Sequence, residues 1–137
     1  WSSKASSRRL YSARDYARDF QGYLTENPKP APQVVKEVTV AIGRNLEEAK
    51  THLAAMKKDF AAEAGAIAAI ESIEKKLVAV HEHHLKLCEC CENENFEVIK
   101  TIECCNNLAS ELDTIVAEHD ALMLKLVRKP GVPTAKR

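Results

Sequence analysis

The sequence predicts an all-α protein, an up-down-up-down antiparallel four-helix bundle. Only four glycines interrupt the 137 residues, and the five prolines lie near the two ends of the chain. Ala, Leu, Glu and Lys are abundant and the period-two alternation of a surface strand is missing, which favours helices. Three consecutive apolar stripes repeat with steps of three and four residues over at least about 25 residues each. Short connections between such helices make neighbours antiparallel.

The first helix is expected from about Ser3 to Leu24, with Ser2 or Ser3 as its N-cap. Three tyrosines flank its apolar face. Three prolines within residues 28–32 end it, because proline lacks an amide hydrogen and clashes with the preceding turn of a helix. We expect this segment to be a stiff extended crossing rather than a domain linker. The predicted buried face is Leu10, Ala13, Ala17, Phe20 and Leu24.

The second helix is expected from about Gln33 to Ala62, and the third from Ala66 to Cys91. Gly65 is the one break between their stripes, so it marks either a helix boundary or a kink. The predicted buried face of the second helix is Val35, Thr39, Ile42, Leu46, Ala49, Leu53, Met56 and Phe60; that of the third begins with Ala66, Ile70, Ile73, Leu77 and Val80.

The fourth helix is expected to be capped by Asn93 or Asn95 and to end near Val127. Residues 1–128 then form a single domain, and the basic segment 129–137 is predicted to be disordered. The rival architecture is a three-helix bundle with a loose N-terminal helix. The predicted buried face of the fourth helix is Val98, Ile102, Cys105, Ala109, Leu112, Val116, His119, Met123 and Leu126.

The charge distribution excludes some partners. The net charge is zero, but basic residues gather at both ends of the chain and acidic residues in its centre. A nucleic-acid surface needs basic residues on one folded face, so we expect no nucleic-acid partner. No apolar run reaches the roughly 18 residues of a membrane span. An acidic protein or a second copy of the chain would fit the basic ends. The chain starts at Trp1, which would fit a cleaved signal peptide and export to a periplasm, or a choice of expressed fragment.

One stretch, His81 to Cys105, holds three of the five histidines and all five cysteines. His84, Cys88 and Cys91 stand at positions i, i+4 and i+7, so they share one helix face and continue the apolar stripe of the third helix. Cys105 stands on the stripe of the fourth helix. Nitrogen and sulfur ligands at core positions of two neighbouring helices predict a metal site.

The expected register of the two helices suggests a ligand set. With the turn centred near Glu94, His84 is expected to lie level with Cys104. In that register a disulfide across the hairpin, for instance from Cys91 to Cys104, is expected to lie beyond reach. Nitrogen and thiolate ligands suit Cu(I) or Zn(II), the two metals we expect here. The predicted ligands are His84, Cys88 and Cys105, with His81 or Cys91 as a fourth.

Other interpretations of these residues stay open. His83, Cys90 and Cys104 would form a second site, contact another subunit or face solvent. Buried free cysteine also packs as a small hydrophobic residue, so the cysteines could be core filler in a structural or interaction bundle. His119 and Met56 lie on core stripes and would be the axial ligands of a b-type haem. No C-x-x-C-H, phosphate-binding loop or nucleophile motif is present, and we expect no enzyme activity.

Cys88, Cys91 and Cys105 on inward faces, with His81 and His84 beside them, give the chain a resemblance to the bacterial copper storage proteins. The resemblance covers the bundle architecture and about 25 residues. In that family many cysteines fill the core and bind numerous Cu(I) ions. This chain has five cysteines and no C-x-x-x-C repeat. The resemblance therefore implies one or a few ions at one end, as in a carrier or sensor rather than a large store.

Overall fold

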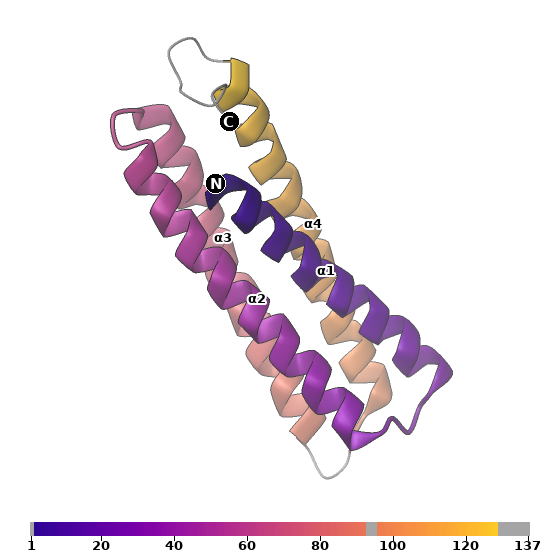
Figure 1. Ribbon diagram of the computed structural model, residues 1–137. Coiled ribbons are helices and arrows are strands. Elements are labelled where there is room, and N and C mark those ends of the chain that lie inside the picture. Colours follow the sequence, from indigo (N-terminus) through magenta and orange to yellow (C-terminus); the bar gives the residue numbers. More distant parts are fainter. Residues whose placement is uncertain (1, 93–95, 129–137) are drawn as a thin grey trace.

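The computed structural model describes residues 2–92 and 96–128 and confirms the four-helix bundle (Figure 1). Successive helices run antiparallel. The crossing between the first two helices, the end of the third helix and the start of the fourth lie at one end of the bundle, opposite the start of the first helix. The helices are α1 (Ser2–Glu26), α2 (Pro32–Asp59), α3 (Ala64–Glu92) and α4 (Val98–Arg128).

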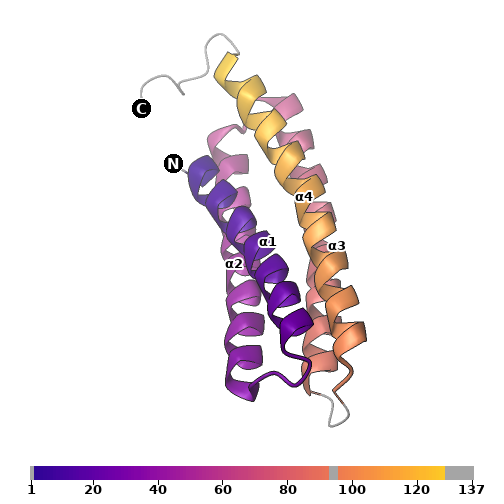
Figure 2. The ribbon, with the colours of Figure 1, turned by 90° about the vertical axis from the view of Figure 1, so that its right-hand side faces the viewer.

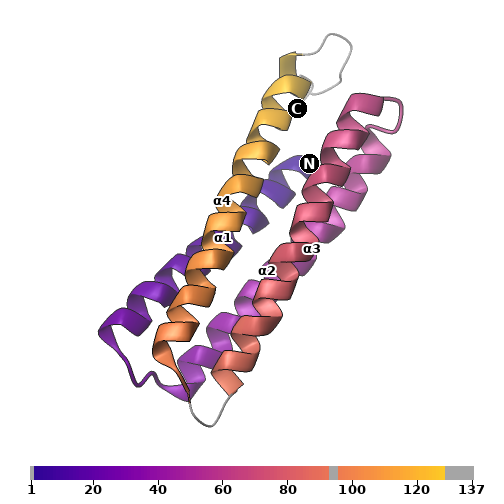
Figure 3. The same ribbon diagram turned by 180° about the vertical axis from the view of Figure 1, so that it is seen from behind.

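The helices form a ring in which α1 packs against α2 and α4, and α3 packs against the same two (Figures 2 and 3). Among the described residues, the two diagonal pairs make no comparable contact. The predicted buried face of α1, from Leu10 to Leu24, is at most 1% exposed. The rival three-helix bundle with a loose first helix is therefore wrong.

The core consists of the predicted stripes with one addition. On α2 the predicted face is buried except for Phe60, which is half-buried, and the apolar part of the α3 face is buried as predicted. On α4 a second buried row accompanies the predicted one, because this helix faces both α1 and α3. Val98, Ile102 and Met123 are only partly buried there. The added row is Thr101, Leu108, Ile115 and Leu122.

The boundary between α2 and α3 differs from the prediction. α2 ends at Asp59 rather than Ala62, because Phe60 leaves the helical conformation at φ −112°, ψ 30°. Gly65 lies in the first turn of α3 and is not the break. The alanines at 61 and 62 favour helix, so propensity alone extends the second helix too far. The turn is instead set by the packing of α3 back along α2.

Both ends of the α1–α2 crossing are held locally. Pro32 opens α2, where its missing amide hydrogen is not needed and its fixed φ suits the helix. The backbone N–H of Ala31 donates to the Tyr23 hydroxyl oxygen at 3.2 Å, which ties the crossing to α1.

At the start of α4, the Glu97 carbonyl accepts the N–H of Thr101 at 3.1 Å. The predicted caps at 93 and 95 and the basic segment 129–137 lie outside the described residues.

Ion pairs join neighbouring helices around the ring. Exposed pairs of this kind contribute about 0–1 kcal/mol each, so they favour one register of the helices more than they stabilise the fold. The pairs include Arg9–Glu48 between α1 and α2 (2.6 Å), Lys57–Glu74 between α2 and α3 (2.8 Å), Lys76–Glu118 between α3 and α4, and Arg14–Asp113 between α1 and α4 (3.3 Å).

Among the described residues, no helix contains an apolar segment of the length that a membrane span requires.

Candidate functional site

Two contacts define how α3 and α4 face one another near the cysteines. Cys90 Sγ lies 4.0 Å from Cys104 Sγ. Farther from the turn, His83 Nδ1 lies 3.0 Å from Glu111 Oε2. Cys104 is thus opposite Cys90 rather than His84, and the predicted register is wrong by six residues, or about 9 Å along α3.

The length of the connection explains only part of this error. The prediction centred the turn on Glu94, whereas α3 ends at Glu92 and α4 begins at Val98, so the midpoint of the connection is residue 95. A shift of the midpoint by one residue moves each cross-helix pairing by two, which accounts for two of the six residues. The rest is a displacement of α4 along α3 that the position of the turn does not determine.

His84 is buried between α3 and α2, with 8% of its surface exposed. Its ring lies against Gly43, where an added Cβ atom would come within 2.8 Å of His84 Cε1. His84 Nε2 lies 2.8 Å from the backbone oxygen of Thr39, and because a carbonyl only accepts, Nε2 carries the hydrogen. Cys88 Sγ lies 3.7 Å from the same nitrogen. His84 Nδ1 therefore holds the lone pair, and it is buried without a hydrogen-bond partner among the described residues.

The other predicted ligands do not close around His84. His81 is exposed, and its ring centroid lies 6.2 Å from that of His84. Cys88 and Cys91 are half-buried, and Leu87 rather than Cys88 continues the buried face of α3. Within residues 2–92 and 96–128, no group of three or more His, Cys, Asp or Glu side chains is placed to hold a metal ion. A metal at this end would require side chains to rotate toward it.

The five cysteines are all free thiols at the α3–α4 end of the bundle. Cys105 is fully buried in the core, and the partly buried Cys91 packs against the same core. Cys90 and Cys104 are also half-buried and contact each other. The thiols thus form an inner pair, Cys91 and Cys105, and an outer pair, Cys90 and Cys104.

Burial keeps these thiols protonated. Together with a smaller effect of neighbouring thiols, burial raises the pKa of Cys91 and Cys105 to about 12 and that of Cys104 to about 11. Burial, and then the charge of Glu92, also raises the pKa of Cys88. At neutral pH these groups are therefore neutral thiols, and a metal ion that binds them must displace protons.

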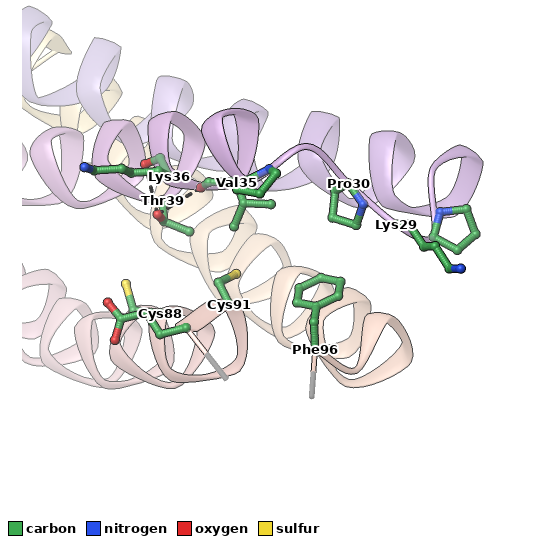
Figure 4. A pocket seen from close by; sticks show the side chains of 11 residues that line it. Lys29, Pro30, Val35, Lys36, Thr39, Cys88, Cys91 and Phe96 are labelled. Atoms are coloured by element: carbon green, nitrogen blue, oxygen red, sulfur yellow. Dashed lines mark hydrogen bonds between the residues drawn. The ribbon is translucent and has the colours of Figure 1, made fainter. Parts of the chain in front are cut away.

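A pocket of about 720 Å³ opens beside the thiols, between the α1–α2 crossing and the end of α3 (Figure 4). Cys88 and Cys91 line it, and their sulfur atoms point toward the α2 side. Lys29 and Lys36 bring positive charge to the lining, and Phe96 adds an apolar surface. The pocket gives two of the five thiols a route to solvent.

His119 and Met56, the residues considered for haem, lie near the other end of the bundle and are joined by Ser6. Ser6 Oγ lies 2.7 Å from His119 Nε2 and 3.4 Å from Met56 Sδ, and all three residues are at most 1% exposed. Ser6 Oγ also donates to the Ser3 carbonyl at 3.0 Å. The hydroxyl fills the interval between the two side chains, which therefore act as packed core residues in this structure.

Two groups that hold His84 in place, Gly43 and the Thr39 carbonyl, were not predicted from the sequence, because neither has a reactive or metal-binding side chain. Gly43 could have been noticed for another reason. A glycine inside a helix weakens it by about 0.5–1 kcal/mol, so such a residue often marks a close approach of another element. The pairing of Cys90 with Cys104 was missed because the expected register was wrong.

Comparison with known proteins identifies no relative: no family model matches the chain, and no curated protein or solved structure is significantly similar to it.

Proposed function

We propose that this bundle binds a soft metal ion, Cu(I) or Zn(II), between α3 and α4, and that it works as a carrier, sensor or small-capacity store. The observation that supports this best is the 4.0 Å separation of Cys90 Sγ and Cys104 Sγ. Two sulfur ligands of one tetrahedral zinc ion lie about 3.8 Å apart, because each Zn–S bond measures about 2.3 Å. The two helices thus present a pair of thiols at the spacing that one ion requires.

The inner pair of thiols supplies the remaining ligands. Cys91 and Cys105 directly follow Cys90 and Cys104 in the chain. Thiols of the opposite helix raise the pKa of each: Cys104 raises that of Cys91, and Cys91 raises that of Cys105, so the thiols of the two helices lie near one another. The proposed set keeps Cys91 and Cys105 from the sequence-based prediction and adds the outer pair. Cys88 Sγ faces His84 Nε2 at 3.7 Å, but this nitrogen donates its hydrogen to the Thr39 carbonyl, so His84 and Cys88 are left out of the set. The exposed His81 is also left out.

The donor atoms favour soft metals over hard ones. Thiolates select Cu(I), Zn(II) and iron–sulfur clusters, whereas Mg²⁺ and Ca²⁺ prefer oxygen. Because the thiols are protonated without metal, binding releases protons, and affinity falls as the solution is acidified.

Replacing both Cys90 and Cys104 by serine is expected to abolish tight metal binding. The loss should exceed the roughly 10–100-fold that removal of a supporting outer-shell partner causes, because two direct ligands disappear. Cu(I) affinity is measured under a reductant against a chromogenic Cu(I) chelator, and Zn(II) affinity against a chromogenic zinc chelator. Circular dichroism should show unchanged helix content, because both residues are only half-buried and serine is close to cysteine in size.

Cys88→Ser is the matched control. This thiol lies in the same stretch and is also half-buried, but it belongs to neither pair. Its loss should leave the affinity for the first metal ion within a few-fold of the parent. If the parent chain fails to compete with either chelator, or if Cys88→Ser weakens binding as much as the double variant, the proposed site is wrong.

A second candidate, a non-catalytic interaction bundle, is favoured by one observation on α3. Val78 and Leu85 are 62% and 51% exposed, and they stand seven positions apart, so they lie on one face of the helix. A second copy of the chain would cover this face. If so, sedimentation should show a concentration-dependent dimer that Val78→Glu with Leu85→Glu abolishes, whereas a monomer at all concentrations excludes this interpretation.

A further inference from the structure

We propose that Cys90 and Cys104 form a reversible disulfide that joins α3 to α4 when the metal-free bundle meets a low-molecular-weight disulfide such as oxidised glutathione. This modification goes beyond the proposed metal binding and needs only the two thiols. It also differs from the sequence-based expectation that a disulfide across the hairpin, for instance from Cys91 to Cys104, lies beyond reach.

The geometry of the pair favours this bond. The two sulfur atoms are 4.0 Å apart and must approach by about 2 Å to reach the S–S bond length of about 2.05 Å. Rotation about the Cα–Cβ bonds supplies such a shift without separating the helices. Both residues are half-buried, so an oxidant reaches them while they stay oriented toward each other.

The neighbouring thiols are poorer partners. Cys105 is fully buried, so a soluble oxidant has no access to it. Consecutive residues of a helix point about 100° apart, which keeps Cys90 and Cys91 from bonding to each other within α3. Cys88 has its contact with His84 Nε2 rather than with a second sulfur atom. Among the described contacts, the Cys90–Cys104 pair is the one in which two sulfur atoms meet.

The reaction is an exchange of one disulfide for another. The thiolate of one cysteine attacks a sulfur atom of oxidised glutathione, which forms a mixed disulfide and releases one glutathione thiolate that takes up a proton. The second cysteine loses its proton and attacks the bound sulfur of the first, which forms the Cys90–Cys104 bond and releases the second glutathione. The protein loses two hydrogen atoms, and the oxidant gains them.

The bond would link residues 14 positions apart in the sequence, across the connection between α3 and α4. Cross-linking a loop of this length restricts the unfolded chain, so the oxidised protein should melt on the order of 10 °C above the reduced protein. If the proposed metal site is also correct, oxidation consumes two of its ligands and releases the ion.

The test oxidises the full chain with excess oxidised glutathione in the presence of a chelator. The intact mass should fall by about 2 Da relative to the reduced protein, by the hydrogen balance above. After digestion with a protease that cleaves after glutamate, the peptide of residues 90–92 should be joined by a disulfide to the peptide that begins at Cys104. Cys90→Ser and Cys104→Ser should each prevent the cross-link, while the matched variants Cys88→Ser and Cys91→Ser should still form it. Dithiothreitol should reverse it.

A cross-link that survives Cys90→Ser, or a protein that takes up glutathione at single cysteines without closing a ring, would overturn the inference. Circular dichroism of each variant shows whether a negative result reflects loss of the fold, and Cys90→Ala serves as a second replacement in that case. The outcome is separable from metal binding: a chain that forms the disulfide but binds no metal disproves the proposed function alone. A chain that binds metal but forms no disulfide disproves this inference alone.

Discussion

Replacing Gly43 by alanine is expected to lower the free energy of unfolding by about 1–3 kcal/mol. The new Cβ atom would lie 2.8 Å from His84 Cε1, closer than contacting atoms tolerate, and 3.2 Å from Nε2, which is tighter than most such contacts. Either α2 moves away from α3, or the ring turns and loses its buried hydrogen bond to the Thr39 carbonyl. The gain in helix propensity from alanine, about 0.5–1 kcal/mol, offsets part of this loss. Urea unfolding followed by circular dichroism measures the difference.

Gly22→Ala provides the matched control. Gly22 also lies inside a helix, but an added Cβ atom there meets nothing within 4 Å, so the substitution should stabilise the protein by about 0.4–1 kcal/mol. Combining Gly43→Ala with His84→Ala removes the obstacle, and in that background the alanine at 43 should become stabilising. If Gly43→Ala stabilises the parent chain as much as Gly22→Ala does, the close packing of α2 on the His84 ring is refuted.

Acidification is expected to destabilise the bundle through His119. This residue is fully buried, and burial lowers its pKa below the usual value of about 6.5; the neighbouring Asp120 raises the pKa, but by less. The unfolded chain therefore binds a proton more readily than the folded one. Stability from this group is fully present above about pH 6.5 and is lost as the pH falls from there to the folded pKa, by at most about 1.4 kcal/mol per pH unit.

The pH effect can be isolated by difference. His119→Met fills a similar volume without a titrating group, so the unfolding free energy of this variant should depend less on pH between 7 and 5 than that of the parent. Above pH 7.5 the two curves should run parallel. Asp120→Asn removes the charge that favours the imidazolium ion, and should extend the loss to lower pH. Identical pH profiles for the parent and His119→Met would show that His119 is protonated without penalty in the fold.

The sequence was sufficient for the architecture because the architecture depends on periodicity. The faces from Leu10 to Leu24 and from Ala66 to Val80 repeat at helical spacing, and burying them leaves few other arrangements. The end of α2 was misjudged because the alanines at 61 and 62 favour helix while the fold requires a turn there. Such a turn follows from tertiary packing, which local propensity does not contain.

The sequence could bring the cysteines to one end of the bundle but could not pair them. Helices three and four and their order were predicted correctly, so the five thiols do lie near one another at that end. Which thiol faces which depends on how far α4 is displaced along α3, and an error of six residues in that displacement moved Cys104 from Cys90 to His84. The role of the Thr39 carbonyl was out of reach for a different reason: a backbone oxygen inside a helix looks the same at every residue.

The ring of helices has a consequence for the order in which the chain can complete its core. During synthesis α1 emerges first and α4 last, yet they are neighbours, and Ser6 meets His119 across 113 positions of sequence. The interfaces between consecutive helices form from local contacts, which close quickly. One side of α1 must wait until nearly the whole bundle has left the ribosome. The thiols of α3 and α4 belong to the last hairpin made, so they meet each other at about the time that α1 finds its final partner.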